Sequence, residues 1–509
     1  MWVVYLVVAA GFMFGIVAWR RRSRRGAIGL PKGPRGYPIL GMRCFSLLRT
    51  YPEQTLHRWA QEYGPLYSFT IGNQRFVVVS DPGIAKSLFL SNGAICSDRK
   101  EMFVKSRTIL KGRGITSTRY GDMWRRHRRI ATASLDPKDA GQQTGVLDLE
   151  TTKMIRALLR DCADGKRLNP QVYIGRCSLN CMVAITFGSP RIRVADSRVL
   201  ALSREFMNTT GPMSNLVDFV PGWLQRSLPW EMQRRGKQLH AALVDTYGRQ
   251  VKRIERRMET GVQVEDCFVK TMVATRDREQ LDDLDMAMLA SAFMVGGVET
   301  TASIIQWFSA LIPSHKHVQR KAHEELDRVV GRNRLPTLED EANLPYCRAI
   351  IKEVERCHNP FWLGTPHAAS KDLVCDNKFI PAGSVLVLDT WTMHHDPVRY
   401  PDPLKFNPDR YLDDSLSSAK SARLADPRLR DHWTFGVGRR ICPGILVAQR
   451  EIWLAVTKML WAFDLAEVPG HPVDLNEYDG ASGRSPVPFE IVLRPRSERI
   501  RKVICKGIE

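Results

Sequence analysis

The amino-acid sequence predicts a mainly α-helical fold with a minor β part. Residues 317–331 repeat apolar side chains at the spacing of one helix face and stop at a glycine. Residues 280–314 form an unusually long helical run that ends near a proline. Strand-like runs are few and short, and the Val-rich segments 76–79 and 385–388 are typical of buried strands.

The domain organisation follows from the absence of internal linkers. A chain of 509 residues could hold two or three domains, but no Gly/Ser-rich or acidic linker divides it after residue 45. We therefore expect an anchor at 1–19, a basic and proline-rich hinge at 20–45, and one large domain at 46–509. A composition with 44% hydrophobic and 25% charged residues suits a globular body with a large core.

The N-terminal segment has the features of a single transmembrane anchor. Residues 1–19 carry no charge, and a helix of that length just spans a hydrocarbon core about 30 Å thick. Five arginines lie within residues 20–25, which by the positive-inside rule keeps the rest of the chain on the cytoplasmic side. A cleaved signal peptide carries its basic residues before the apolar run instead. Three prolines and two glycines within residues 30–38 predict a stiff connector after the anchor.

The formal net charge is +21, from 75 basic and 54 acidic residues. Such an excess is compatible with a nucleic acid, a membrane surface or an acidic protein partner. We find no zinc-finger or RNA-recognition pattern, and therefore expect no nucleic-acid partner. Eleven cysteines without a CxxC pair indicate reduced thiols in a cytosolic body.

The strongest local pattern is FGVGRRICPG at residues 435–444, followed by a predicted helix at 445–461. The positive end of a helix dipole and free backbone N–H groups favour the thiolate form of Cys442 just ahead of that helix. Arg440 can pair with a carboxylate, and Phe435 can pack against a ligand and exclude water. Three glycines allow tight turns and a close approach to a flat ligand, namely Gly436, Gly438 and Gly444.

This segment matches FxxGxRxCxG, so the chain resembles the cytochrome P450 family. The resemblance implies the family's triangular helical prism and a haem b (iron protoporphyrin IX) whose iron is bound by Cys442. A thiolate ligand pushes electron density onto the iron and favours O–O cleavage. It also implies that Arg440 pairs with a haem propionate and that Phe435, Gly436 and Gly444 contact the haem.

A second group of motifs lies upstream of the cysteine and also resembles the family. Residues 353–356 match ExxR, and residues 406–410 resemble FxPxR. Glu353 and Arg356 are three apart, so on a helix they face the same side and can pair. The resemblance implies that Arg410 completes a buried Glu–Arg–Arg cluster that stabilises the scaffold behind the haem. The sequence departs from the family at Glu355, where an apolar residue is usual.

The long predicted helix carries GGVETT, which resembles the family's [AG]GxETT segment. Two adjacent glycines inside a helix cost about 1 kcal/mol each relative to alanine, so they need a reason. Close approach of a bulky ligand to Gly297 is one reason, and packing between helices is the alternative. The resemblance implies that Thr300 donates a hydrogen bond to bound dioxygen and that Glu299 helps to supply protons.

Two further residue pairs resemble the family's propionate contacts. Trp124 and Arg128 match WxxxR, and on a helix they lie one turn apart on the same face. His367 follows a proline at the place where the family puts another propionate partner. The resemblance implies that these three side chains bind the haem together with Arg440.

The resemblance covers essentially the whole chain and implies a monooxygenase. Residues 431–434 and the WRRHRR form of the WxxxR motif look like fungal members of secondary metabolism. We expect insertion of one oxygen atom of O2 into a lipophilic secondary metabolite, which is a polyketide, terpenoid or alkaloid. The expected electron source is NADPH through a flavoprotein reductase, with cytochrome b5 as a further partner. The expected place is the endoplasmic reticulum membrane, with the catalytic body facing the cytosol.

The expected substrate pocket is assembled from separated stretches, namely 101–114, 206–221, Phe293, Met294, 361–365 and 482–485. Two other functions stay open. One is a haem-thiolate isomerase or dehydratase that works without a reductase; members of that kind often lack the helix threonine that is present here as Thr300. The other is a non-catalytic haem protein or a basic membrane-binding protein.

Overall fold

The computed structural model describes residues 29–34, 51–135, 140–162, 165–188, 196–211, 214–220, 222, 225, 231–361, 363–480 and 484–506. The predicted anchor at 1–19 and most of the hinge at 20–45 lie outside the described residues. Helices make up most of the described body, and the strands are short, as the sequence predicts.

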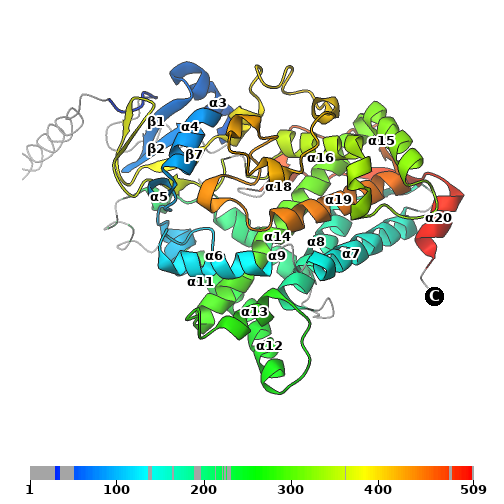
Figure 1. Ribbon diagram of the computed structural model, residues 1–509, viewed down its shortest axis with the longest axis horizontal. Helices are drawn as coiled ribbons and strands as arrows, with labels where there is room; N and C mark the ends of the chain where they lie inside the picture. The colour runs from blue at the N-terminus through cyan, green and yellow to red at the C-terminus, as the bar shows by residue number, and fades with distance from the viewer. Residues whose placement is uncertain are drawn as a thin grey trace, which may run out of the picture.

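Helix α14 (Asp283–Leu311) runs through the centre of the body (Figure 1). Asp282 caps its N-terminus by accepting a hydrogen bond from the N–H of Asp285 at 2.6 Å. The helix ends in a 3-10 turn at Ile312–Ser314, so the predicted run at 280–314 is confirmed. Among the described helices, the stretch Asp283–Ser314 is long and apolar enough to cross a membrane, but most of it is buried inside the body. Because protein surrounds α14, the helix is apolar on every side without having to cross a membrane.

Four helices pack around α14 or against its neighbours: α7 (Ala140–Asp161), α8 (Pro170–Phe187), α9 (Asp196–Thr209) and α19 (Ile445–Ala462). Helix α19 begins as predicted, directly after the cysteine pattern. The predicted helix at 317–331 is α15 (Lys316–Val329), which packs against α16 (Pro345–Cys357) and α19. The cysteine pattern and the ExxR motif are therefore held by helices that share one core.

The remaining α-helices are α3 (Pro52–Tyr63), α4 (Pro82–Ala85), α5 (Gly93–Cys96), α6 (Asp122–Ser134), α11 (Glu231–Leu243), α12 (Arg249–Glu259), α13 (Phe268–Thr275), α17 (Thr390–His394), α18 (Ser418–Ser421) and α20 (Glu498–Cys505). The π-helical turns are η1 (Lys86–Ser91), η2 (Phe103–Ile109) and η6 (Val244–Gly248). The further 3-10 turns are η5 (Leu216–Phe219), η8 (Leu338–Asn343), η9 (Pro408–Tyr411), η10 (Pro427–Leu429) and η11 (Gly438–Arg440).

The main sheet lies at one end of the body and has the order β1-β2-β7-β4 (Figure 1). Its strands are β1 (Leu66–Ile71), β2 (Gln74–Val79), β7 (Val385–Leu388) and β4 (His367–Ala368). The two predicted strands are confirmed and pair with each other in parallel, with Phe76 opposite Val385. The described part of the chain also forms three smaller sheets. One has three strands, β3 (Arg167–Leu168), β11 (Ile491–Pro495) and β8 (Phe463–Glu467). The other two have two strands each, which are β5 (Leu373–Cys375) with β6 (Lys378–Ile380) and β9 (Tyr478–Asp479) with β10 (Ser485–Pro486).

An ion-pair cluster joins α16 to η9, with Glu353 and Arg356 fully buried and Arg410 partly exposed. Arg356 donates to both carboxylate oxygens of Glu353, at 2.7 and 2.8 Å. Arg410 contacts the same carboxylate at 3.4 Å, and the N–H of Asn407 donates to it at 2.8 Å. Arg356 also donates to the backbone carbonyls of His394, Pro403 and Lys405 and to the sulfur of Cys357. The geometry brings together the three residues that the sequence predicts to form this cluster.

We predict that Arg356→Ala lowers the free energy of unfolding by about 3–5 kcal/mol, because it leaves the Glu353 carboxylate buried without its partner. Urea unfolding of the purified protein, followed by tryptophan fluorescence, measures the loss. The matched control is Arg428→Ala, which removes an exposed arginine paired with Asp426 and leaves stability nearly unchanged. An Arg356 variant as stable as this control would contradict a structural role for the cluster.

Candidate functional site

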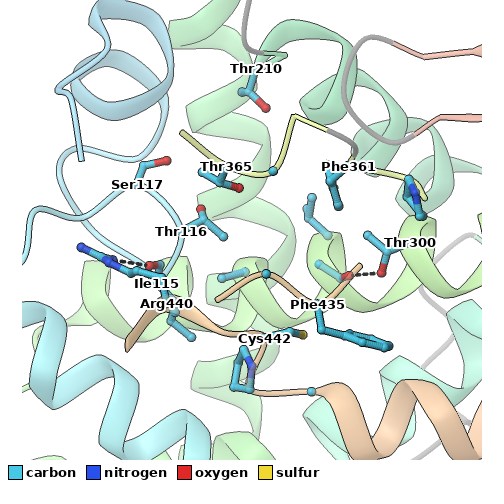
Figure 2. A pocket seen from close by; sticks show the side chains of 18 of the residues that line it. Ile115, Thr116, Ser117, Thr210, Thr300, Phe361, Thr365, Phe435, Arg440 and Cys442 are labelled. Carbon is cyan, nitrogen blue, oxygen red and sulfur yellow. Dashed lines mark hydrogen bonds between the residues drawn. The ribbon is translucent and has the colours of Figure 1, made fainter. Parts of the chain in front are cut away.

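A cavity of about 390 Å³ lies beside the middle of α14 and receives side chains from most parts of the fold. Figure 2 shows Cys442 at one end of this cavity, with Phe435 beside it, and Thr210 at the opposite end. Most of the lining side chains are apolar, and several buried cations lie among them. The cavity is therefore suited to a largely apolar ligand that carries some negative charge.

The cysteine loop, residues 435–442, presents the sulfur of Cys442 to this cavity. The N–H of Cys442 donates to the carbonyl of Phe435 at 2.9 Å, which closes the loop, and Gly444 caps the N-terminus of α19. Burial raises the pKa of the Cys442 thiol, whereas the N–H of Gly444 and the charge of Arg128 lower it. A bound metal ion would deprotonate this thiol outright. The sulfur is thus placed as a metal ligand.

The other ligands of such a metal would have to come from a cofactor. Within the described ranges, no group of three or more His, Cys, Asp or Glu side chains is placed to hold a metal ion. A macrocycle that supplies its own nitrogen ligands meets this requirement, and haem with a single cysteine ligand is of that kind.

Two glycines of the cysteine loop adopt a left-handed backbone that other residues rarely take. The φ angle is +76° at Gly436 and +62° at Gly438. The space around them differs. A Cβ at Gly436 would meet nothing nearby, whereas a Cβ at Gly438 would collide with the backbone carbonyl of Phe89. Gly438 is therefore required both by its backbone conformation and by the close approach of η1.

A set of nitrogen-bearing side chains, which we call the cationic wall, lies near the cysteine loop; its members are Arg99, Trp124, Arg128, His367 and Arg440. Arg99, Arg128, His367 and Arg440 line the cavity, whereas Trp124 does not line it and contacts Arg440. Arg440 donates to three backbone carbonyls at 2.8–3.0 Å, those of Ser97, Ile115 and Thr118. Its guanidinium stacks 4.3 Å from the centre of the Trp124 ring, and burial lowers its pKa to about 10. The Trp124 indole N–H donates to the carbonyl of Ile115 at 3.1 Å.

Arg128 lies one turn after Trp124 on α6 and also lines the cavity. Burial lowers the pKa of its guanidinium, and the charge of Cys442 raises it. No other described residue gives it a hydrogen bond or an ion pair. An arginine in this situation fits a bound group that carries a carboxylate, because guanidinium–carboxylate pairs form strong bidentate contacts.

His367 lies on β4, where its Nδ1 contacts the carbonyl of Cys96 at 2.8 Å. Burial and the charges of Arg99 and Arg440 hold its pKa well below the ordinary value, so the ring is neutral. The sequence-predicted residues Trp124, Arg128, His367 and Arg440 thus meet in one wall.

Arg99 was not predicted from the sequence, although it is buried in the same wall. Its guanidinium donates to the carbonyls of Thr116, Thr365 and Pro366. It follows Asp98 in an irregular segment, and no local pattern indicates that its side chain points inward. Three guanidiniums and a histidine beside the Cys442 sulfur are a suitable set for the two propionates of a haem.

The glycines and the threonine of α14 lie where the helix passes the cavity. The hydroxyl of Thr300 donates to the carbonyl of Gly296 at 2.7 Å (Figure 2). Gly296 and Gly297 both line the cavity, but a Cβ on Gly297 would collide with the sulfur of Met182 on α8. The need for glycine at 297 therefore has a packing reason, which was the alternative to close approach of a ligand.

Glu299 does not line the cavity, although Gly297 and Thr300 do. Burial raises the pKa of its carboxyl, the charge of Arg204 lowers it, and that of Asp479 raises it. Glu299 can therefore supply protons to the cavity only through groups that lie between its carboxyl and the cavity.

Glu355, the departure from the family pattern, is buried and paired. Its carboxylate contacts the Nε2 of His432 at 2.8 Å, and its backbone carbonyl accepts a hydrogen bond from the Thr434 hydroxyl at 3.0 Å. Burial lowers the pKa of His432, but the carboxylates of Asp431 and Glu355 raise it above its ordinary value. The histidine therefore offsets the cost of a carboxylate at a position that is usually apolar.

The predicted pocket stretches 101–114, 206–221 and 361–365 all contribute to the cavity, and Phe293 does too. The prediction for Met294 is wrong, because that side chain does not line the cavity and is packed in the main core. Successive residues on a helix point about 100° apart, and the side chain of Met294 points into the core and not into the cavity. Of the stretch 482–485, residue Arg484 lines the cavity and residues 482–483 lie outside the described residues.

We predict that Gly438→Ala is more damaging than Gly436→Ala. Both substitutions strain a left-handed backbone by about 1–2 kcal/mol, but at 438 the new Cβ must also push η1 away. The readout is the fraction of purified protein that carries bound haem, with its half-life at raised temperature. Equal damage from the two substitutions would show that η1 does not restrict the loop.

Comparison with known proteins agrees with this arrangement. A family model described as Cytochrome P450 matches residues 31–493. Cytochrome P450 monooxygenase polD of Polytolypa hystricis is 32% identical over 513 residues, covering 98% of this chain and 95% of that protein. Cytochrome P450 monooxygenase acuC of Aspergillus aculeatus is 33% identical over 472 residues, covering 89% and 86%. Cytochrome P450 monooxygenase patH of Penicillium expansum is 31% identical over 471 residues, covering 89% and 86%.

The fold also matches a solved structure. A zebra fish cytochrome P450 with progesterone superposes with a TM-score of 0.74 at 22% identity, covering 87% of this chain and 99% of that chain. This likeness concerns the fold, whereas the sequence matches extend over nearly the whole chain. The chain belongs to the cytochrome P450 family and is a monooxygenase of that family.

Proposed function

We propose that this chain binds haem b through the thiolate of Cys442 and inserts one oxygen atom of O2 into a lipophilic secondary metabolite. The observation that carries the proposal is the sulfur of Cys442 at the end of an apolar cavity that Arg128 also lines, with no hydrogen bond or ion pair from any described residue to its guanidinium. Bound haem supplies the one-electron and dioxygen chemistry, and a thiolate ligand favours O–O cleavage.

The cationic wall is proposed to hold the two haem propionates. Arg440 is fixed by its three carbonyl contacts and keeps two N–H groups for a propionate. Arg128 and Arg99 add two more buried cations, and pairing with carboxylates offsets the cost of burying them. Phe435, Gly436 and Gly444 are proposed to pack against the haem face near the sulfur.

Thr300 is proposed to guide protons into the cavity. Its hydroxyl is bonded to the carbonyl of Gly296, and it lines the cavity together with Gly296 and Gly297. By rotating, the hydroxyl can exchange this bond for one into the cavity. Glu299 is proposed to exchange protons with it through water, since burial raises the pKa of this carboxyl.

Electrons are proposed to come from NADPH through a flavoprotein reductase, with cytochrome b5 as a further donor. Arg125 and Arg129 are exposed on α6, one turn apart, and an acidic partner could bind them. We further propose that residues 1–19 anchor the chain in the endoplasmic reticulum membrane, with the hinge at 20–45 and the haem domain at 46–509 facing the cytosol. The three fungal relatives support a secondary metabolite as the substrate; a polyketide, a terpenoid or an alkaloid fits the apolar lining.

The deciding experiment compares the reduced, CO-bound spectrum of the purified protein with that of Cys442→Ser. We predict a thiolate-type carbonyl band for the natural protein and its loss in the variant, because serine is a poor ligand for this iron. NADPH consumption with the reductase then separates a monooxygenase from an isomerase or dehydratase, which needs no electrons. A natural protein that holds haem without the thiolate-type band would contradict the proposal.

We predict that Thr300→Ala lowers the product formed per NADPH consumed by about 10- to 100-fold, because a positioned proton donor is lost. Thr300→Ser keeps the hydroxyl and should retain most of the yield. The measurement is product and NADPH in the same assay, with the CO-bound spectrum as the check that the site is intact. If the alanine variant is as well coupled as the serine variant, the hydroxyl is not the proton donor.

A further inference from the structure

Lys105 is a half-buried cation that the haem site does not explain. It lies in η2, and its side chain lines the cavity. Its ammonium lies 5.9 Å from the centre of the Phe206 ring, and in the described part of the chain no hydrogen bond or ion pair reaches it. Burial lowers its pKa to about 8, so it is still mainly charged at neutral pH.

The charged groups around Lys105 leave one positive charge in excess. Asp218 is the carboxylate whose charge acts on Lys105, but it accepts a hydrogen bond from the N–H of Val104 at 3.2 Å instead. Lys100 donates to the backbone carbonyl of Asp218 at 3.0 Å and adds a second cation. Arg99 adds a third, whose contacts are the backbone carbonyls described above. With Arg99 assigned to the haem, two lysines face one carboxylate.

A hydroxyl group without a partner lies on the same side of the cavity. Thr210 follows Phe206 by four residues, and its N–H continues the helix by donating to the Phe206 carbonyl at 3.0 Å. The two side chains therefore share one helix face. The Thr210 hydroxyl is buried and has no hydrogen-bond partner in the described residues, and Figure 2 shows it at the end of the cavity opposite Cys442. We call Lys105, Phe206 and Thr210 the roof.

We propose that the substrate is a lipophilic carboxylate whose carboxylate group pairs with the Lys105 ammonium and accepts a hydrogen bond from Thr210. This inference rests on the proposed function, because it takes the same cavity as the substrate site. A carboxylate has two oxygens and can accept from both roof donors at once. The apolar part then extends from the roof toward Cys442, so that a carbon remote from the carboxylate is the one oxidised.

A haem propionate is the competing partner for Lys105. The cationic wall already offers three guanidiniums and a histidine to two propionates. Arg440 and Thr210 also lie at different ends of the cavity in Figure 2. The geometry therefore favours a ligand group at the roof that is separate from the haem.

The test is a binding titration of the haem-loaded protein with dodecanoate and with dodecanamide, a neutral analogue of the same shape. Dissociation constants are read from the haem spin-state change, or by equilibrium dialysis where the spectrum does not change. We expect dodecanoate to bind about 10- to 100-fold more tightly, the range for a hydrogen bond to a charged group. Lys105→Met should bring this ratio close to one, and Thr210→Val should lower it by about two- to tenfold. Lys86→Met, which removes an exposed lysine, is the matched control and should leave the ratio unchanged.

Each outcome has a distinct meaning. Equal affinities for the acid and the amide in the natural protein, or an unchanged ratio in Lys105→Met, would overturn the inference. Loss of haem from Lys105→Met, with both ligands weakened equally, would overturn it by assigning the lysine to a propionate. The proposed function is tested separately, because it fails only if the thiolate-type carbonyl band is missing from the natural protein.

Discussion

The hydrogen bond from the N–H of Cys442 to the carbonyl of Phe435 fixes the position on which the whole site depends. It holds the sulfur at the end of the cavity, directly before the first turn of α19. The loop can take this shape because Gly438 accepts a left-handed backbone against Phe89 of η1. Burial disfavours the thiolate form of Cys442, so this side chain is fully ionised only when a metal is bound.

Charge is distributed around the cavity in three separate groups with different partners. Behind the cysteine loop, Glu353 and Arg356 pair with each other, and neighbouring protein groups supply their remaining partners. In the cationic wall, Arg128 lines the cavity and has no ion pair with any described residue. At the roof, Lys105 also lines the cavity without an ion pair to a described residue, and Asp218 is the carboxylate whose charge acts on it. A buried charge is stable only when it is paired, so the two unpaired groups describe what the cavity has to receive.

The sequence predicted those parts of the molecule that local patterns determine. The long helix α14, the strands at 76–79 and 385–388 and the turn before α19 each follow from a contiguous pattern of residue types. Arg99, which was missed, lies in the segment between α5 and α6, where no periodicity indicates which residues point inward. Lys105 lies in the predicted pocket stretch 101–114, but the sequence did not single it out for the same reason. The error at Met294 has a related cause, because a helix that is apolar on all sides does not reveal which side faces the cavity.

The parallel pairing of β2 with β7 joins segments about 300 residues apart in the chain. Strand β4, which carries His367, pairs with β7 and not with β2. Such a pairing has a high contact order, and it cannot form on the ribosome until most of the chain has been made. Cofactor binding is therefore a late step of biogenesis. Before that step, an incomplete nascent chain exposes the apolar surface of the cavity, which chaperones must cover.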